Sequence, residues 1–132
     1  MSESSMRQRL VAALKPLDAV PIENRLRAGT PDVNYIGGWM ELKWLRSWPI
    51  RGGVISLPHY TIAQRSWLRR RGKRGGIAML VLQVGKQWLF FDWEYSFYVG
   101  KTETRLDLEK YAVKHFPNGL KNKELVAWLQ SL

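Results

Sequence analysis

The sequence predicts an α/β fold in which helices flank a central mixed β-sheet, and two observations support this class. Segments with helical and extended patterns follow one another in the order helix, three strands, helix, two strands. Hydrophobic residues make up 45% of the 132 residues, which excludes a disordered chain and is enough for a single core. We therefore expect one domain over residues 1–132, with a core at about residues 3–92 and a helical C-terminal extension at about residues 103–132.

Each expected element follows from apolar spacing and from chain breakers. The first helix, residues 5–14, has Leu10, Ala13 and Leu14 on one side, and Pro16 disrupts its end. A second helix with the same kind of spacing is expected at residues 60–71. Extended segments are expected at residues 20–26, 33–36, 39–44, 77–84 and 87–92, a loop at residues 44–58, and closing helices at residues 103–115 and 122–132.

A Gly-Gly pair at residues 37–38 lies between two runs of β-branched, aromatic and aliphatic residues, which predicts a tight hairpin. With these glycines as the turn, Asp32 is expected opposite Lys43, and Asn34 opposite Glu41. Side chains alternate along a strand and cross-strand partners share a face, so these four polar side chains should lie together. The opposite face should be core, formed by Val33, Tyr35, Met40 and Leu42.

Asp32 and Glu41 place two carboxylates close together, which is unfavourable unless a cation lies between them. Oxygen ligands of this kind suit Mg²⁺ or Mn²⁺ better than zinc. Lys43 beside them could activate a water molecule or neutralise charge on a phosphate. The combination indicates phosphodiester hydrolysis. The same spacing also fits a solvated ion pair between Asp32 and Lys43, with Glu41 merely exposed.

The motif G-T-P-D at residues 29–32 and the motif E-L-K at residues 41–43 together resemble the signature of the PD-(D/E)XK nuclease superfamily. This form is similar to that of the VRR-NUC nucleases and of the archaeal and phage Holliday-junction resolvases. The resemblance extends to Glu23 and to residues 64–68, so it covers about residues 3–84. It implies a restriction-endonuclease-like sandwich and a Mg²⁺-dependent deoxyribonuclease, with Mn²⁺ as an alternative metal, that cuts branched DNA.

The resemblance also implies the roles of individual residues. Asp32 and Glu41 would bind the metal, the Leu42 carbonyl could add a ligand, and Lys43 would assist the attacking water.

The family usually adds one more acid to the metal site, and the chain offers two candidates for it. We prefer Glu23, because the extended segment at residues 20–26 should run beside Asp32. Glu3, at the start of the first helix, is the alternative. Glu23 could instead pair with Arg25 or Arg27, and Glu3 could simply be an acid that the helix dipole favours.

The formal net charge is +10, and no Asp or Glu occurs from residue 44 to residue 91. Basic residues concentrate at the end of the second helix and in the loop after it. Such a surface is expected to bind a polyanion, with an affinity that falls steeply with salt. The residues predicted to bind DNA are Arg25, Arg27, Gln64, Arg65, Arg69, Arg70, Arg71, Lys73 and Arg74, with Gln64 included on the resemblance alone.

The chain has no cysteine, no secretory leader at its start and no apolar run long enough to cross a bilayer. We therefore expect a soluble protein of the cytoplasm of a prokaryotic or phage-infected cell, with DNA as its partner and no membrane association. The apolar stripe of the last helix, Val126, Trp128 and Leu129, could pack inside the molecule or form a homodimer. Two other functions remain open: a non-catalytic nucleic-acid-binding protein on a nuclease scaffold, and a restriction-type or general DNA nuclease.

Overall fold

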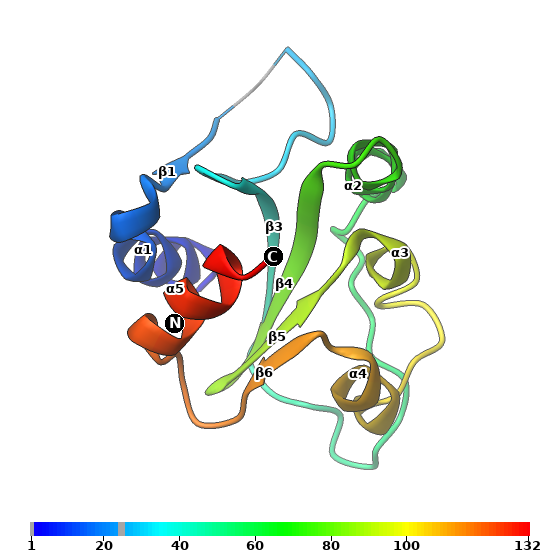
Figure 1. Ribbon diagram of the computed structural model, residues 1–132. Helices are drawn as coiled ribbons and strands as arrows, with labels where there is room; N and C mark the ends of the chain where they lie inside the picture. The colour runs from blue at the N-terminus through cyan, green and yellow to red at the C-terminus, as the bar shows by residue number, and fades with distance from the viewer. Residues whose placement is uncertain (1, 24–25) are drawn as a thin grey trace.

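The computed structural model describes residues 2–23 and 26–132, and Figure 1 shows their arrangement as a sheet between two layers of helices. The strands follow one another across the sheet in chain order, from β1 to β6. The elements are α1 (Glu3–Ala13), the 3₁₀ helix η1 (Lys15–Leu17), β1 (Val20–Pro21), β2 (Val33–Tyr35), β3 (Gly38–Leu45), α2 (Ile62–Lys73), β4 (Ile77–Val84), β5 (Gln87–Phe91), α3 (Trp93–Ser96), α4 (Arg105–Tyr111), β6 (Lys114–Phe116) and α5 (Asn122–Gln130).

The sheet is mixed because one of its neighbouring strand pairs is parallel. β3 and β4 run in the same direction and pair over eight residues, from Gly38 with Ile77 to Leu45 with Val84. The other neighbouring pairs are antiparallel. A parallel pair needs a crossover connection, and α2 lies in the segment that joins β3 to β4. The protein is therefore an α/β protein with a mixed sheet, as the sequence predicts.

Helices cover both faces of the sheet (Figure 1). α1 and α5 lie on one face, and α2, α3 and α4 lie on the other. The central strand β4 is buried on both faces: Met79 and Val81 join the core under α1 and α5, whereas Leu80 and Leu82 join the core under α2. Burial on both faces explains why β4 is apolar throughout rather than alternating.

The last helix uses its apolar stripe inside the molecule. Leu125 and Leu129 of α5 are buried in the same core as α1, and Val126 and Trp128 pack against that core while partly exposed. The Trp128 ring meets Phe90 of β5 edge-on, with ring centroids 5.6 Å apart. Intramolecular packing is therefore the use of this stripe that the structure shows.

The β2–β3 hairpin has a different register from the one that the Gly-Gly pair predicts. Gly38 pairs with Tyr35 and belongs to the sheet, so the turn lies at Ile36 and Gly37. Continuing this register places Asp32 opposite Glu41 rather than opposite Lys43. A shift of two residues keeps the alternation, so the expected core face is confirmed: Val33, Tyr35, Met40 and Leu42 are all buried in the α1 core.

The reason for this register lies in β4. A Cβ atom on Gly38 would lie only 2.4 Å from the Ile77 carbonyl oxygen. Residue 38 is thus a glycine because the backbones of β3 and β4 approach each other closely there, and not because a turn needs it.

Three further differences from the sequence prediction concern the length of an element or its presence. β1 is two residues long instead of seven, and it contains Pro21, which has no N–H to donate to a sheet. The expected helix at residues 103–115 ends at Tyr111, and His115 lies instead in β6, which pairs with β5. The short helix α3 was not expected; Asp92 caps it by accepting a hydrogen bond from the Tyr95 N–H at 3.0 Å.

Among the described residues, no helix combines the length and the apolar character that crossing a membrane requires.

Candidate metal centre and basic surface

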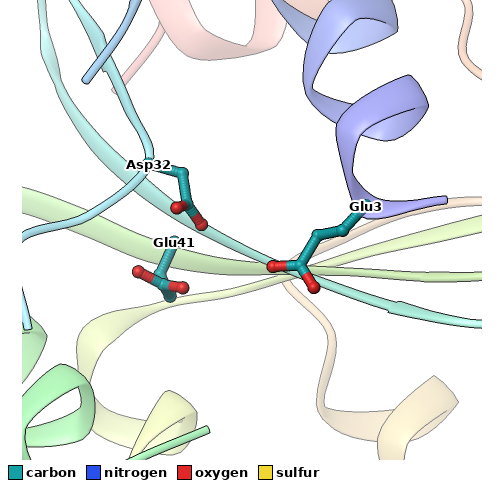
Figure 2. Close-up of side chains that lie close together, drawn as sticks. All are labelled: Glu3, Asp32 and Glu41. Atoms are coloured by element: carbon teal, nitrogen blue, oxygen red, sulfur yellow. The ribbon is translucent and has the colours of Figure 1, made fainter. Parts of the chain in front are cut away.

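Three carboxylates from three separate segments meet at one edge of β3. Glu3, Asp32 and Glu41 each offer one carboxylate oxygen, and these oxygens lie within 4.8 Å of one another. Figure 2 shows how the three side chains come together, with Glu3 reaching in from the start of α1. We call Glu3, Asp32 and Glu41 the carboxylate cluster.

The cluster forms where β3 loses its partner on one side. β2 pairs with β3 only from Gly38 to Met40, whereas β4 pairs with β3 along its whole length. Beyond Met40, the Asp32 carboxylate takes the place of a strand by accepting a hydrogen bond from the Leu42 N–H at 2.9 Å. The N–H and C=O of one strand residue point toward the same neighbour, so the Leu42 carbonyl is directed to this edge as well.

Glu41 is the most unusual member of the cluster. It is 1% exposed, and neither of its carboxylate oxygens has a hydrogen-bond partner in the part of the chain that the structure describes. Burial, and then the neighbouring Asp32 carboxylate, raises the pKa of Glu41 to about 9. Buried carboxyl groups are normally hydrogen-bonded, whereas within the described chain Glu41 has only an ion-pair contact, to Lys43.

Lys43 is the cation beside Glu41. Its ammonium lies 3.3 Å from Glu41 Oε2, donates to the backbone carbonyl of His59 at 3.2 Å, and lies 5.8 Å from the centre of the Tyr60 ring. Lys43 is 6% exposed, so these contacts fix a charged group that has lost most of its water. Among the described residues, Lys43 is the cation that forms a salt bridge with a member of the cluster.

Glu3 completes the cluster because α1 begins there. Ser2 caps the helix by accepting a hydrogen bond from the Ser5 N–H at 3.1 Å, which fixes the first turn that carries Glu3. The residue as a whole is exposed, but its carboxyl group is turned toward the cluster (Figure 2). Burial raises the pKa of Glu3, the Lys43 charge lowers it, and the Asp32 charge raises it again.

Glu23, which the sequence analysis prefers as the third acid, lies elsewhere, and this corrects the preference. The Ile22 N–H donates to the Asp32 carbonyl at 2.8 Å, so Ile22 is the residue that pairs with Asp32 and shares its face. Glu23 then belongs to the opposite face of the sheet. It is exposed there and lines a pocket beside α1, together with Arg7, Gln8, Val11 and Pro21.

The G-T-P-D motif is held in place by its glycine. Gly29 has a φ of +82°, and a Cβ atom there would lie 2.4 Å from the Ala63 carbonyl oxygen in α2. Both the left-handed backbone and the close approach to α2 require glycine at this position. The Thr30 hydroxyl donates to the Arg27 carbonyl at 3.1 Å, which further fixes the segment that leads to Asp32.

Six of the predicted DNA-binding residues lie on one surface, formed by α2, its C-terminal end and Arg27 from the segment before β2. Arg27, Arg70, Arg71, Lys73 and Arg74 are exposed, and Arg69 is half-buried with its guanidinium 4.6 Å from the centre of the Phe97 ring. These six residues are called the basic surface below. Arg25 lies outside the described residues.

Arg65 does not belong to the basic surface, which corrects the prediction that it contacts DNA. It is 5% exposed and donates to the carbonyls of Phe97 and Val99 at 2.7 Å each, and to the Tyr60 carbonyl at 3.2 Å. Burial lowers the pKa of Arg65. Its role is to tie α2 to the segment after α3.

Gln64 has a structural task at the start of α2. Its side-chain oxygen accepts the Thr61 N–H at 2.9 Å, and the Thr61 hydroxyl accepts the Gln64 N–H at 3.2 Å, which is a complete capping box. The expectation from the resemblance, that this glutamine approaches DNA, therefore competes with a helix cap.

Two residues near the cluster were missed. His59, whose carbonyl receives the Lys43 ammonium, follows a loop, and the sequence pattern contains no signal that would bring it to β3. Trp39 had such a signal, because it precedes Glu41 by two residues and must share its face. Trp39 is only partly buried, and it lines a pocket rather than the core alone.

In comparisons with known proteins, no family model matches the chain and no curated protein matches it.

Proposed function

We propose that this protein is a metal-dependent DNA endonuclease of the PD-(D/E)XK type, which hydrolyses phosphodiester bonds. The observation that carries the proposal is the Glu41 carboxyl group, buried without a hydrogen-bond partner among the described residues and within 4.8 Å of carboxylate oxygens of Glu3 and Asp32. A buried group of this kind beside two further acids would be stabilised by a cation in addition to Lys43.

The donor set of the carboxylate cluster suits a hard divalent cation. Glu3, Asp32 and Glu41 would hold Mg²⁺ or Mn²⁺, and the Leu42 carbonyl is directed to the same edge of β3. When bound, the metal would supply Lewis-acid activation of a phosphate ester and would lower the pKa of a bound water. The fit is electrostatic as well, because a cation would offset the repulsion among the three carboxylates.

The protein's own groups have separate roles in this proposal. Asp32 is oriented by the hydrogen bond that it accepts from the Leu42 N–H, so its other carboxylate oxygen stays available. Lys43, held by Glu41 and by the His59 carbonyl, can donate a hydrogen bond to a phosphate oxygen and so offset the negative charge that develops there, or it can orient the attacking water. The basic surface on α2 would bind the DNA backbone next to this site.

The substrate that we propose is branched DNA, on the resemblance of the G-T-P-D and E-L-K motifs to those of Holliday-junction resolvases. The basic surface supports DNA as the partner, since exposed arginines bind phosphates with little dependence on sequence.

The test compares a labelled four-way junction with a matched linear duplex in Mg²⁺, in Mn²⁺ and in EDTA. Asp32→Asn and Glu41→Gln each remove one carboxylate charge from the cluster, and Glu124→Gln removes the same charge from α5 on the other face of the sheet. We expect metal-dependent cutting that falls more than about a hundredfold in the first two variants, since even residues that only orient metal ligands are worth 10–100-fold. Glu124→Gln should cut at the wild-type rate.

Preferential cutting of the junction supports a resolvase, and equal cutting of both substrates supports a general nuclease. Tight DNA binding without cutting in any metal contradicts the proposed activity and points to a binding protein on a nuclease scaffold.

A further inference from the structure

A pocket between the β2–β3 hairpin and α2 combines arginine with tryptophan. No acid lines it. Its lining residues are Arg27, Thr30, Trp39, Trp67, Arg70, Arg71 and Arg74. We call it the Arg-Trp pocket.

The pocket adjoins the carboxylate cluster along the chain. Trp39 precedes Glu41 by two residues of the same strand, so the two side chains share a face and are separated by about 7 Å along β3. Thr30 precedes Asp32 by two residues as well. Both segments that carry a candidate metal ligand therefore also contribute to the pocket.

The aromatic part of the pocket is partly open. The Trp39 and Trp67 rings meet at an angle of 62° with their centroids 5.3 Å apart. Trp67 is 7% exposed, so it serves mainly as a support, whereas Trp39 keeps part of its ring exposed. The Arg71 guanidinium lies 4.5 Å from the Trp67 ring centre and 5.7 Å from the Trp39 ring centre. A guanidinium that stacks on indole rings in this way can still donate its N–H groups to an anion.

The cationic part of the pocket suits a phosphate. Arg70 and Arg74 are exposed side chains at the end of α2, and neither forms a salt bridge with an acid of the described residues. Guanidinium groups bind phosphate oxygens in pairs of parallel hydrogen bonds. A phosphate and a flat aromatic group are both parts of a nucleotide, which is the ligand that this lining fits.

We propose that the Arg-Trp pocket holds an unpaired nucleotide of the DNA strand that the carboxylate cluster cuts, with its base against Trp39 and its phosphate against Arg70 and Arg74. The inference rests on the proposed function and adds to it a requirement for a locally single-stranded substrate. The requirement follows because a paired base is stacked between its neighbours, and neither of its faces can meet an indole ring until it leaves the stack.

The experiment measures binding rather than cutting, so that failure of the proposed activity does not affect it. In EDTA, the wild-type protein is titrated with a labelled single-stranded oligonucleotide, with the matched duplex, and with a duplex that carries a short single-stranded gap. The variants are Trp39→Leu, Trp39→Phe, Arg70→Ala and Arg74→Ala. Lys123→Ala is the control, because it removes an exposed positive charge from α5 on the other face of the sheet.

We expect the single strand and the gapped duplex to bind several-fold more tightly than the intact duplex. Trp39→Leu should weaken single-strand binding about tenfold, the order expected for one stacked base, and Trp39→Phe should restore most of it. Arg70→Ala and Arg74→Ala should weaken binding several-fold and reduce its salt dependence, while Lys123→Ala stays within twofold of wild type.

Three results would overturn the inference. The intact duplex could bind as tightly as the single strand, Trp39→Leu could leave single-strand binding unchanged, or Lys123→Ala could weaken binding as much as Arg70→Ala does. If Trp39→Leu weakens binding and Trp39→Phe does not restore it, a circular dichroism melt shows whether both variants are folded; if they are not, Arg70→Ala and the comparison of single strand with duplex carry the test. Two folded variants with equally weak binding would also overturn the stacking role.

Discussion

Two groups of polar side chains among the described residues differ in how many of their members have hydrogen-bond partners within the protein. The first is the carboxylate cluster with Lys43. The second, which we call the Gln87 network, connects five residues near β5. Trp48 donates its indole N–H to the Gln87 side chain, and Gln87 Nε2 contacts Glu109 Oε2 at 2.9 Å and His115 Nε2 at 3.1 Å. Arg105 donates to Glu109 Oε2 at 3.4 Å and lies over the Trp48 ring.

The comparison indicates what each group is for. In the Gln87 network, each of the five side chains has a partner within the protein, and together they tie the loop after β3 to β5, α4 and β6. In the carboxylate cluster, Glu41 has neither oxygen hydrogen-bonded within the described chain. A satisfied network stabilises the fold, whereas a buried acid without a hydrogen-bond partner is the kind of group that the proposed metal ion would stabilise. The predictions below test this difference.

The largest effect is expected from Lys43→Met. This change removes the cation that, among the described residues, lies next to Glu41, and it keeps an apolar stem of similar length, so the rate of DNA cutting should fall by about a hundredfold or more. Single-turnover cutting of a labelled junction measures it. Lys114→Met, which removes a half-buried lysine 2.9 Å from Glu124, is the control and should cut normally. A Lys43→Met enzyme with the wild-type rate would remove Lys43 from the mechanism.

The next effect is the response of stability to metal. Mg²⁺ should raise the melting temperature of the wild-type protein by several degrees at concentrations well above its dissociation constant, because about 2.7 kcal/mol is gained at a hundredfold excess. Glu41→Gln should abolish most of this shift. Glu109→Gln, which alters the Gln87 network, should respond to Mg²⁺ as the wild type does. Equal shifts in all three proteins would show that the metal binds outside the carboxylate cluster.

The pH dependence of stability should distinguish the two groups as well. In the metal-free protein, the pKa of Glu41 is raised from 4.5 to about 9, so the folded state keeps a proton that the unfolded state releases between those values. The stabilising contribution is therefore complete below about pH 4.5 and is lost as the pH rises toward 9, at up to about 1.4 kcal/mol per pH unit.

Urea denaturation between pH 5 and pH 8 measures this slope. Glu41→Gln should flatten it and should be more stable than the wild type at pH 8 without metal. An unchanged slope in Glu41→Gln would assign the titration to another group.

The smallest effect belongs to the Gln87 network. Glu109→Gln should lower the free energy of unfolding by about 1 kcal/mol, because a charged hydrogen-bond acceptor is replaced by a neutral one. At pH 8 without metal, Glu109→Gln should therefore be less stable than the wild type, whereas Glu41→Gln should be more stable. Urea denaturation of both variants under the same conditions makes the comparison, and a stabilised Glu109→Gln would show that the network is strained rather than satisfied.

Local patterns in the sequence determined a good part of this structure. Alternation along residues 33–42 separated the polar face of the hairpin from its core face, and helical spacing located α1 and α2. The same spacing could have placed Arg65 correctly, since it falls on the α2 face that also carries the buried Leu68 and Gly72. These features depend on residues a few positions apart, so the pattern of the chain suffices to set them.

Only the tertiary structure decided which segments meet. The hairpin register was set by the close contact between Gly38 and Ile77, and a shift of two residues leaves the alternation unchanged, so the sequence pattern could not reveal it. Packing between distant segments also decided which acid completes the carboxylate cluster. Glu3 reaches the cluster because α1 packs beside the open edge of β3. Side chains alternate along the segment that begins with β1, and this alternation turns Glu23 to the opposite face of the sheet. Contacts between distant segments depend on how whole elements pack, and no short-range pattern carries that information.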